Sequence, residues 1–407
     1  MKGKMRDKLS QHRIDAPKSR VSGGTVAAVI GKNGVGLFGN KLHRLLGASC
    51  LVTMIGIAAF EQSFAADSKK ATIPRETTTI ATNGDVNPYG VTFVPQGFPK
   101  GGKTEAGDIL VTNFNAGPAP GTQGTGSTIV SISPDGTQTT FFTGTSQLGL
   151  TTALGVLKKG FVIVGSLPTM GGAVQPPGSL IILDKDGNQV AGSPFTDATF
   201  FDGPWDLTLV DNGNSATVFL SCVLNGTVTR FDLTIHGSTV SAPANKVQIA
   251  AGYLFGPSVP ALVVGPTGLA YDAQSDVLYV ASTADNEIFA IADAAKTSTS
   301  TVPGTVIFSD ANHLHGPLGL VLAPNGNLIS SQGDAINQST DPAQQSEIVE
   351  FTKGKGKTPG TFVSQFSIDS VGGSAFGIAI QRNMGAITLG AVDDSMNVLT
   401  VYDLTEK

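Results

Sequence analysis

The sequence predicts an all-β fold, a six-bladed β-propeller, and three observations support this prediction. A strand meander recurs six times, a spare strand precedes the first copy, and the last copy leaves no room for a fourth strand of its own. One meander of short strands cannot bury both of its faces alone, so a recurring meander predicts a repeat architecture. An all-β repeat of this length favours a propeller.

The repeat is clearest between Gly265 and Ala292, GPTGLAYDAQSDVLYVASTADNEIFAIA. It predicts a strand entered through Pro266-Thr267-Gly268, a second strand at 276–281 and a third at 287–292. The other entries are Pro88-Tyr89-Gly90, Ala153-Leu154-Gly155, Pro204-Trp205-Asp206, Pro317-Leu318-Gly319 and Ala375-Phe376-Gly377. Together they predict blades at about 88–145, 149–200, 203–250, 265–310, 315–368 and 373–404.

The two ends of the repeat region are expected to complete one blade. Copies one to five continue into a fourth strand, for example at 137–143 and 360–368, whereas copy six ends with the sequence. The solitary strand at about 76–82 (ETTTIAT) can complete the last blade and close the ring. Closure would cover a sheet edge that is otherwise open to pairing with other chains.

Residues 1–65 differ in composition from the rest and predict a basic leader and signal peptide. Residues 1–44 hold ten Lys or Arg and two acids, 45–60 are largely apolar, and Ser63-Phe64-Ala65 precede a possible cut before Ala66. This order is typical of export, to the periplasm or the cell exterior. An uncleaved anchor is the alternative, although sixteen residues are short for a span of ~20.

Residues 66–407 are expected to form a single propeller domain, and its charge restricts the classes of partner. They hold 16 basic and 28 acidic residues, a net charge of −12. Nucleic acid and anionic lipid select basic surfaces, so neither is an expected partner. Cys222 is the one cysteine in this part, which excludes an internal disulfide. We expect a monomer with no membrane span after removal of the signal.

The pattern resembles the NHL repeat and its relatives among six-bladed propellers, the gluconolactonase-like and senescence-marker-like proteins. The resemblance covers roughly residues 76–405 and is clearest at 265–292 and in HGPLGLVLAPNGNLISSQGD at 315–334. It implies a six-bladed ring but no single activity, because such rings host enzymes and binding modules alike. It also implies that the loops between strands two and three share one rim with the loops that enter each blade.

Long insertions concentrate on that rim and predict a binding face. They lie at 115–127, 168–178 and 333–345, and the entry at 251–264 (AGYLFGPSVPALVV) is notably apolar. Binding residues are often carried by long loops on a rigid scaffold; the alternative is that these loops have merely drifted. The candidate ligand-binding residues are Asn87, Asn113, Asn115, Asp202, Trp205, His313 and His315, with Thr152 and Ser374 at neighbouring blade entries.

A bound metal is a weaker expectation. The resemblance to gluconolactonase-like propellers implies a divalent cation held by a Glu at the first entry with Asn and Asp around the channel. Here the first entry reads Asn87-Pro88, without that Glu, and only His236, His313 and His315 remain after residue 65. Asn87, Asp202 and His315 are the candidate cation ligands, but the sequence requires no cofactor. The alternative is that these side chains satisfy loop backbone groups, and that Trp205 packs between blades.

Two functional hypotheses follow, beside the alternative of a purely structural role in the cell envelope. The first is an exported, non-catalytic propeller scaffold that binds a small molecule or a protein on its loop-rich rim. The second is a metal-assisted hydrolase or lyase of the gluconolactonase-like type. No Gly-x-Ser-x-Gly nucleophile motif occurs. The sequence leaves open whether the protein is an enzyme.

Overall fold

The computed structural model describes residues 68–71, 75–118, 121–354, 358–383 and 386–406. The leader and signal peptide predicted at 1–65 lie outside these residues. The described part consists of strands and one short 3-10 helix, η1 (Pro342–Gln344). No helix within it is long and apolar enough to cross a membrane.

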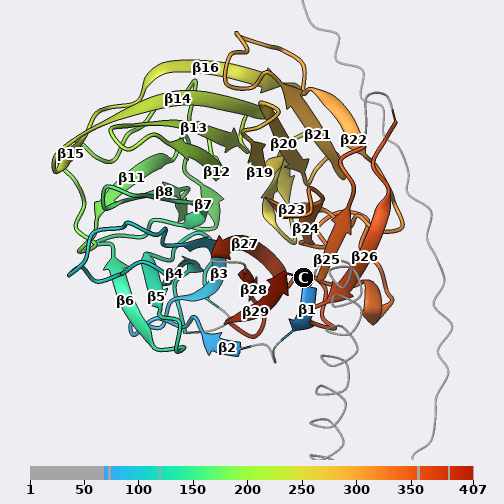
Figure 1. Ribbon diagram of the computed structural model, residues 1–407, viewed down its shortest axis with the longest axis horizontal. Coiled ribbons are helices and arrows are strands. Elements are labelled where there is room, and N and C mark those ends of the chain that lie inside the picture. Colours follow the sequence, from blue (N-terminus) through green and yellow to red (C-terminus); the bar gives the residue numbers. More distant parts are fainter. Residues whose placement is uncertain (1–67, 72–74, 119–120, 355–357, 384–385, 407) are drawn as a thin grey trace, which may run out of the picture. The chain divides into compact units, whose positions relative to one another are not determined.

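Six antiparallel sheets follow one another around a central axis in chain order, which confirms the six-bladed propeller (Figure 1). Blade one contains β3 (Val86–Phe93), β4 (Ile109–Asn115), β5 (Thr128–Ile132) and β6 (Gln138–Thr143). Blade two contains β7 (Leu150–Leu157), β8 (Phe161–Ser166) and β11 (Ser179–Asp184). Blade three contains β12 (Pro204–Asp211), β13 (Ser215–Cys222), β14 (Thr227–His236) and β16 (Ala244–Ala251), with the short β15 (Thr239–Val240) extending β14.

The second half of the ring repeats this order. Blade four contains β19 (Pro266–Asp272), β20 (Val277–Ser282), β21 (Glu287–Ala292) and β22 (Thr305–Phe308). Blade five contains β23 (Pro317–Leu322), β24 (Leu328–Gln332), β25 (Glu347–Phe351) and β26 (Phe362–Ser367). Blade six contains β27 (Ala375–Asn383), β28 (Ala386–Asp393) and β29 (Val398–Glu406), completed by β2 (Arg75–Thr78) and β1 (Ser68–Ala71).

The predicted closure of the ring is confirmed. β2 pairs antiparallel with β29, with Arg75 opposite Val401 and Thr78 opposite Val398, and β1 pairs further along the same edge. The strand is shorter than the predicted 76–82. It ends at Thr78 because the chain turns at Asn83-Gly84, where the Gly84 N–H bonds to the carbonyl of Ala81, before it enters blade one.

Blade two differs from the expectation of a regular fourth strand in copies one to five. Its outer segment makes only isolated bridges, Phe195 to Leu180 and Gln189 to Leu183. Pro194 has no N–H to donate and directly precedes Phe195, which explains why the ladder does not extend through this segment.

Neighbouring blades pack face to face, so their middle strands are buried on both sides. Every residue of β4, β5, β8 and β25 is buried. Cys222 lies in the apolar cluster between blades two and three, where burial raises the pKa of its thiol to about 12. This cysteine is therefore a small core side chain rather than a reactive thiolate.

Near the axis, hydroxyl groups connect each blade to the next. In blades one, three and five the hydroxyl comes from the second strand: Thr112, Ser221 and Ser331 each accept from a backbone N–H of their own first strand and donate to a carbonyl of the following blade. In blade two it comes from the first strand, where the Thr152 hydroxyl donates to the Trp205 carbonyl. In blade four the hydroxyls of Thr267, in the first strand, and Thr283, directly after the second, both donate to the Pro317 carbonyl.

Aromatic side chains fill the axis at the end where the chain enters each blade. Tyr89 stacks between Phe114 and Phe376, with ring centroids 4.4 Å away on each side. Trp205 packs edge-on against Tyr89 and Phe114 at 5.9 Å. Further along the inner strands the channel holds a separate cavity of about 270 Å³, which Asp206 lines. The aromatic cluster therefore separates the rim from the channel.

Candidate functional site on the loop-rich rim

A pocket of about 340 Å³ lies on the loop-rich rim, above the aromatic cluster. Loops of blades two and three and the entry to blade four form it, and its walls are almost wholly apolar. Ligand sites in proteins are typically concave, mostly apolar and of about 300–1,000 Å³. The lining side chains are Ala173, Val174, Val223, Leu224, Phe255, Pro257, Leu262 and Val263.

Two short hairpins form opposite walls of this pocket. One joins β9 (Thr169–Met170) to β10 (Ala173–Val174), and the other joins β17 (Gly256–Ser258) to β18 (Leu262–Val264). Leu262 adopts a φ of 62°, a conformation that costs energy for a branched side chain, while it packs against the apolar cluster at the axis. Val259, at the tip of the second hairpin, is 99% exposed. Part of the apolar entry at 251–264 thus lines one side of the pocket, and other side chains of the same segment are exposed to solvent.

Three of the candidate ligand-binding residues lie inside the fold. Asn113 is wholly buried, and its side-chain amide donates to the Thr79 carbonyl at 3.0 Å and to the Thr128 hydroxyl. Asn115 accepts the Gly124 N–H within the long loop of blade one. Trp205 is 2% exposed and belongs to the aromatic cluster. The contacts of all three are with other residues of the fold.

Asn87 joins blade six to blade one. Its amide donates to Asp394 at 2.6 Å, and its backbone N–H donates to the side-chain oxygen of Asn397 at 2.7 Å. Burial raises the pKa of Asp394 to about 8, with a further contribution from Asp393. The hydrogen bonds between Asn87 and blade six support the closure of the ring.

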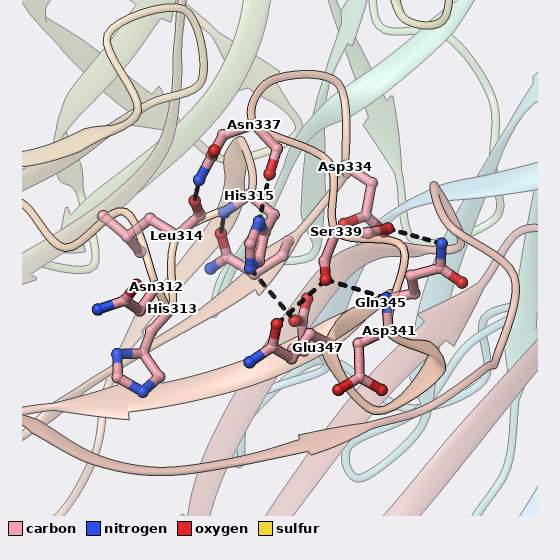
Figure 2. Close-up of polar contacts among 12 residues, drawn as sticks. Asn312, His313, Leu314, His315, Asp334, Asn337, Ser339, Asp341, Gln345 and Glu347 are labelled. Atoms are coloured by element: carbon pink, nitrogen blue, oxygen red, sulfur yellow. Dashed lines mark hydrogen bonds and ion pairs between the residues drawn. The ribbon is translucent and has the colours of Figure 1, made fainter.

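His315 lies beneath the long loop of blade five in a buried polar cluster (Figure 2). Its Nδ1 bonds to the Asn337 carbonyl, which can only accept, so Nδ1 carries a proton. Its Nε2 lies 3.6 Å from Oε1 of Glu347. Glu347 is 0% exposed, neither of its oxygens has another partner in the described part, and burial raises its pKa to about 8. The Glu347 carboxyl therefore faces one side chain, His315, across a gap wider than a hydrogen bond.

The same cluster includes Asp334, whose Oδ2 accepts the backbone N–H groups of Ser346 and Gly373 at 2.7 and 2.8 Å. Burial also raises the pKa of Asp334. His313, only two residues before His315, turns away from it in Figure 2. Its ring stacks on Phe362 and pairs with Asp310 at 2.7 Å. The two histidines therefore do not act at one site.

The three candidate cation ligands belong to three separate sets of contacts. Asn87 contacts blade six, His315 contacts the loop of blade five, and Asp202 lies at the entry to blade three. Within the residues that the structure describes, no three His, Cys, Asp or Glu side chains come together as metal ligands. Asp202 is partly exposed, and desolvation raises the pKa of its carboxyl.

Sequence reasoning did not single out Glu347 or Asp394. Glu347 begins the third strand of blade five, at the position that Thr128 and Glu287 hold in blades one and four, and Asp394 follows the second strand of blade six. The strict alternation in EIVEF places Glu347 on the same face as Val349 and Phe351, and this was the available signal for a buried carboxyl.

No family model matches the chain, and no curated protein matches it. Among solved structures the chain is similar to a catalytically inactive virginiamycin B lyase from Staphylococcus aureus, at 14% identity and a TM-score of 0.42, over 82% of this chain and 99% of that one. It is also similar to a gluconolactonase from Xanthomonas campestris (15%, 0.47, 85% and 92%) and to a regucalcin from Agrobacterium tumefaciens (11%, 0.46, 81% and 95%). Likenesses this distant assign no activity, and the NHL resemblance stays a prediction.

Proposed function

We propose that the protein is a binding propeller that takes an apolar group into the rim pocket. The observation that supports this is the 340 Å³ apolar pocket bordered by exposed Met170, Leu254, Phe255 and Val259. Exposed apolar residues gathered around a hollow mark interaction sites on soluble proteins. The exported location and the monomeric state predicted from the sequence belong to the same proposal, and N-terminal sequencing of secreted protein tests the first of them.

Two rim carboxyls with raised pKa values do not favour the hydrolase alternative. Burial raises the pKa of Glu347 and of Asp394 to about 8, but Glu347 is buried beside His315 and Asp394 is bonded to Asn87. Neither belongs to the pocket lining. A general acid must lie within hydrogen-bond reach of its substrate, and these carboxyls have no such access from the pocket.

The first prediction concerns Phe255, which lines the pocket and is 51% exposed. We expect Phe255→Asp to weaken the binding of Nile red, a neutral apolar dye, by about tenfold, because a carboxylate in the wall must be desolvated when the dye enters. Fluorescence titration measures this. The matched control is Val363→Asp on the outer strand β26, which is also exposed and distant in the fold. Equal loss in both variants, or no saturable binding by the unaltered protein, would contradict the proposal.

A further inference from the structure

The loops of the rim and those of the opposite face differ sharply in charge. The rim loops contain nine aspartates and no lysine or arginine. The loops of the opposite face contain the lysines Lys100, Lys103, Lys158, Lys159, Lys185, Lys296 and Lys353. The rim loops are residues 79–85, 116–127, 144–149, 167–178, 196–203, 223–226, 252–265, 283–286, 309–316, 333–346, 368–374 and 394–397.

Several of these aspartates already have a role within the fold. Asp197 pairs with Lys246, and Asp310 pairs with His313. Asp85 is buried and accepts the Ser127 N–H at 2.8 Å. Asp334 binds backbone N–H groups in the same way. Asp197 and Asp310 thus already pair with a basic side chain, and Asp85 and Asp334 are buried, so we assign none of the four to a partner.

Two other aspartates adjoin the apolar pocket. The backbone carbonyl of Asp202 accepts the N–H of the pocket residue Leu224. Oδ2 of Asp285 accepts the N–H of Leu254 at 3.1 Å, next to the pocket residue Phe255. Neither carboxylate forms an ion pair with a lysine or arginine in the described part of the chain. The pocket thus has apolar walls with the Asp285 carboxylate beside one of them and the residue Asp202, through its backbone, beside another.

Exposed apolar side chains adjoin the pocket without lining it. Met170 lies in the hairpin of blade two, and Leu254 and Val259 lie in the entry to blade four. One small molecule in a 340 Å³ pocket would leave these side chains in water. An extended partner is needed to cover them, and a negative rim repels an anionic one.

We propose that the rim binds a basic, apolar peptide segment of a partner protein. One apolar side chain enters the pocket, and lysine or arginine side chains lie beside Asp202 and Asp285. The inference rests on the proposed function, because it uses the same pocket. Electrostatic complementarity of this kind sets the choice and orientation of a partner more than it adds affinity.

The test uses the full chain and four synthetic probes. These are a nine-residue peptide of alternating Lys and Leu, one of alternating Glu and Leu, one of alternating Lys and Ser, and octylamine. We expect the Lys–Leu peptide to bind most tightly in calorimetry, and to displace Nile red from the pocket. Asp202→Asn with Asp285→Asn should weaken it about tenfold, because the double variant removes two weak, exposed ion pairs with the peptide. The matched control is Glu105→Gln with Asp186→Asn, which removes the same charge from the opposite face.

Each outcome has a defined meaning. Equal weakening by the rim and control variants, or equal binding of the Glu–Leu and Lys–Leu peptides, overturns the inference. Octylamine binding as tightly as the peptide also overturns it, in favour of a small amine. If Nile red binds the pocket while the peptides do not compete, the proposed function stands and only the inference fails. If the peptides bind without displacing the dye, the pocket itself is the wrong site.

Discussion

Glu347 shows how one buried carboxyl can make stability depend on pH. Burial raises its pKa from 4.5 to about 8. As the pH rises above 4.5, the carboxyl of the unfolded chain ionises first, which stabilises the unfolded state relative to the native one. This group's contribution to the free energy of unfolding is therefore intact at low pH and is lost progressively up to about pH 8.

The second prediction follows from this sign. Glu347→Gln should leave the free energy of unfolding nearly unchanged at pH 4.5 and raise it by about 2 kcal/mol at pH 8, because the amide cannot ionise. Urea denaturation at the two pH values measures the difference. Thr139→Val, exposed on β6, changes no ionisable group and is the control for the effect of pH on the denaturation itself. Equal destabilisation of the Gln variant at both pH values would contradict this prediction. It would show that Glu347 affects stability through packing and not through its ionisation.

At the scale of the elements, the hydroxyl bridges between blades explain why small polar residues occur in otherwise apolar strands. Thr112 is wholly buried; it accepts the Gly90 N–H at 2.7 Å and donates to the Thr151 carbonyl at 3.0 Å. Both backbone groups lie at irregular positions where the first strand of a blade begins. The hydroxyl therefore satisfies groups that the ladder leaves unpaired.

The third prediction tests one such bridge. Thr112→Val keeps the shape of the side chain but leaves a buried N–H and a buried carbonyl without this partner. We expect a loss of about 2 kcal/mol in the free energy of unfolding, measured by chemical denaturation. The same substitution at Thr139, exposed on β6, should change stability by less than about 0.5 kcal/mol. Equal effects at the two positions would mean that the bridge contributes nothing.

The same scale shows what the sequence could predict. The six entries and the spare strand were visible because period-two alternation and turn residues are local signals. The apolar segment 251–264 was visible from its composition. The partners of Asn87 and His315 were not, because Asp394 and Glu347 are distant in sequence and become neighbours only after the ring folds. Likewise, nothing local shows that Trp205 packs on Tyr89 from another blade.

At the scale of the whole molecule, the pairing of the N-terminal strands with the last blade closes the ring. β2 and β1 cover the edge of β29, and Arg75 forms an ion pair with Asp403 at 3.1 Å across that junction. The ion pair is exposed and contributes little. The backbone pairing is what prevents the edge from opening.

The fourth prediction compares a chain that begins at residue 66 with one that begins at residue 79 and lacks β1 and β2. The shorter chain should exchange the backbone amides of β29 with solvent much faster and should aggregate more readily, because its sheet edge is open. Hydrogen-exchange mass spectrometry measures the first effect. The amides of β13 in blade three serve as the internal reference. Unchanged protection in β29 would show that the N-terminal strands are dispensable for closure.

The hydroxyl bridges set a rule for rebuilding this scaffold. Blades one to five each supply a hydroxyl that donates to a backbone carbonyl of the following blade, while blade six has Val392 at the corresponding position of β28. The side chain that makes each bridge thus belongs to the earlier blade, and the later blade contributes only backbone. A designer who exchanges a single blade among the first five therefore has to keep its hydroxyl, whereas the junction after blade six imposes no such condition.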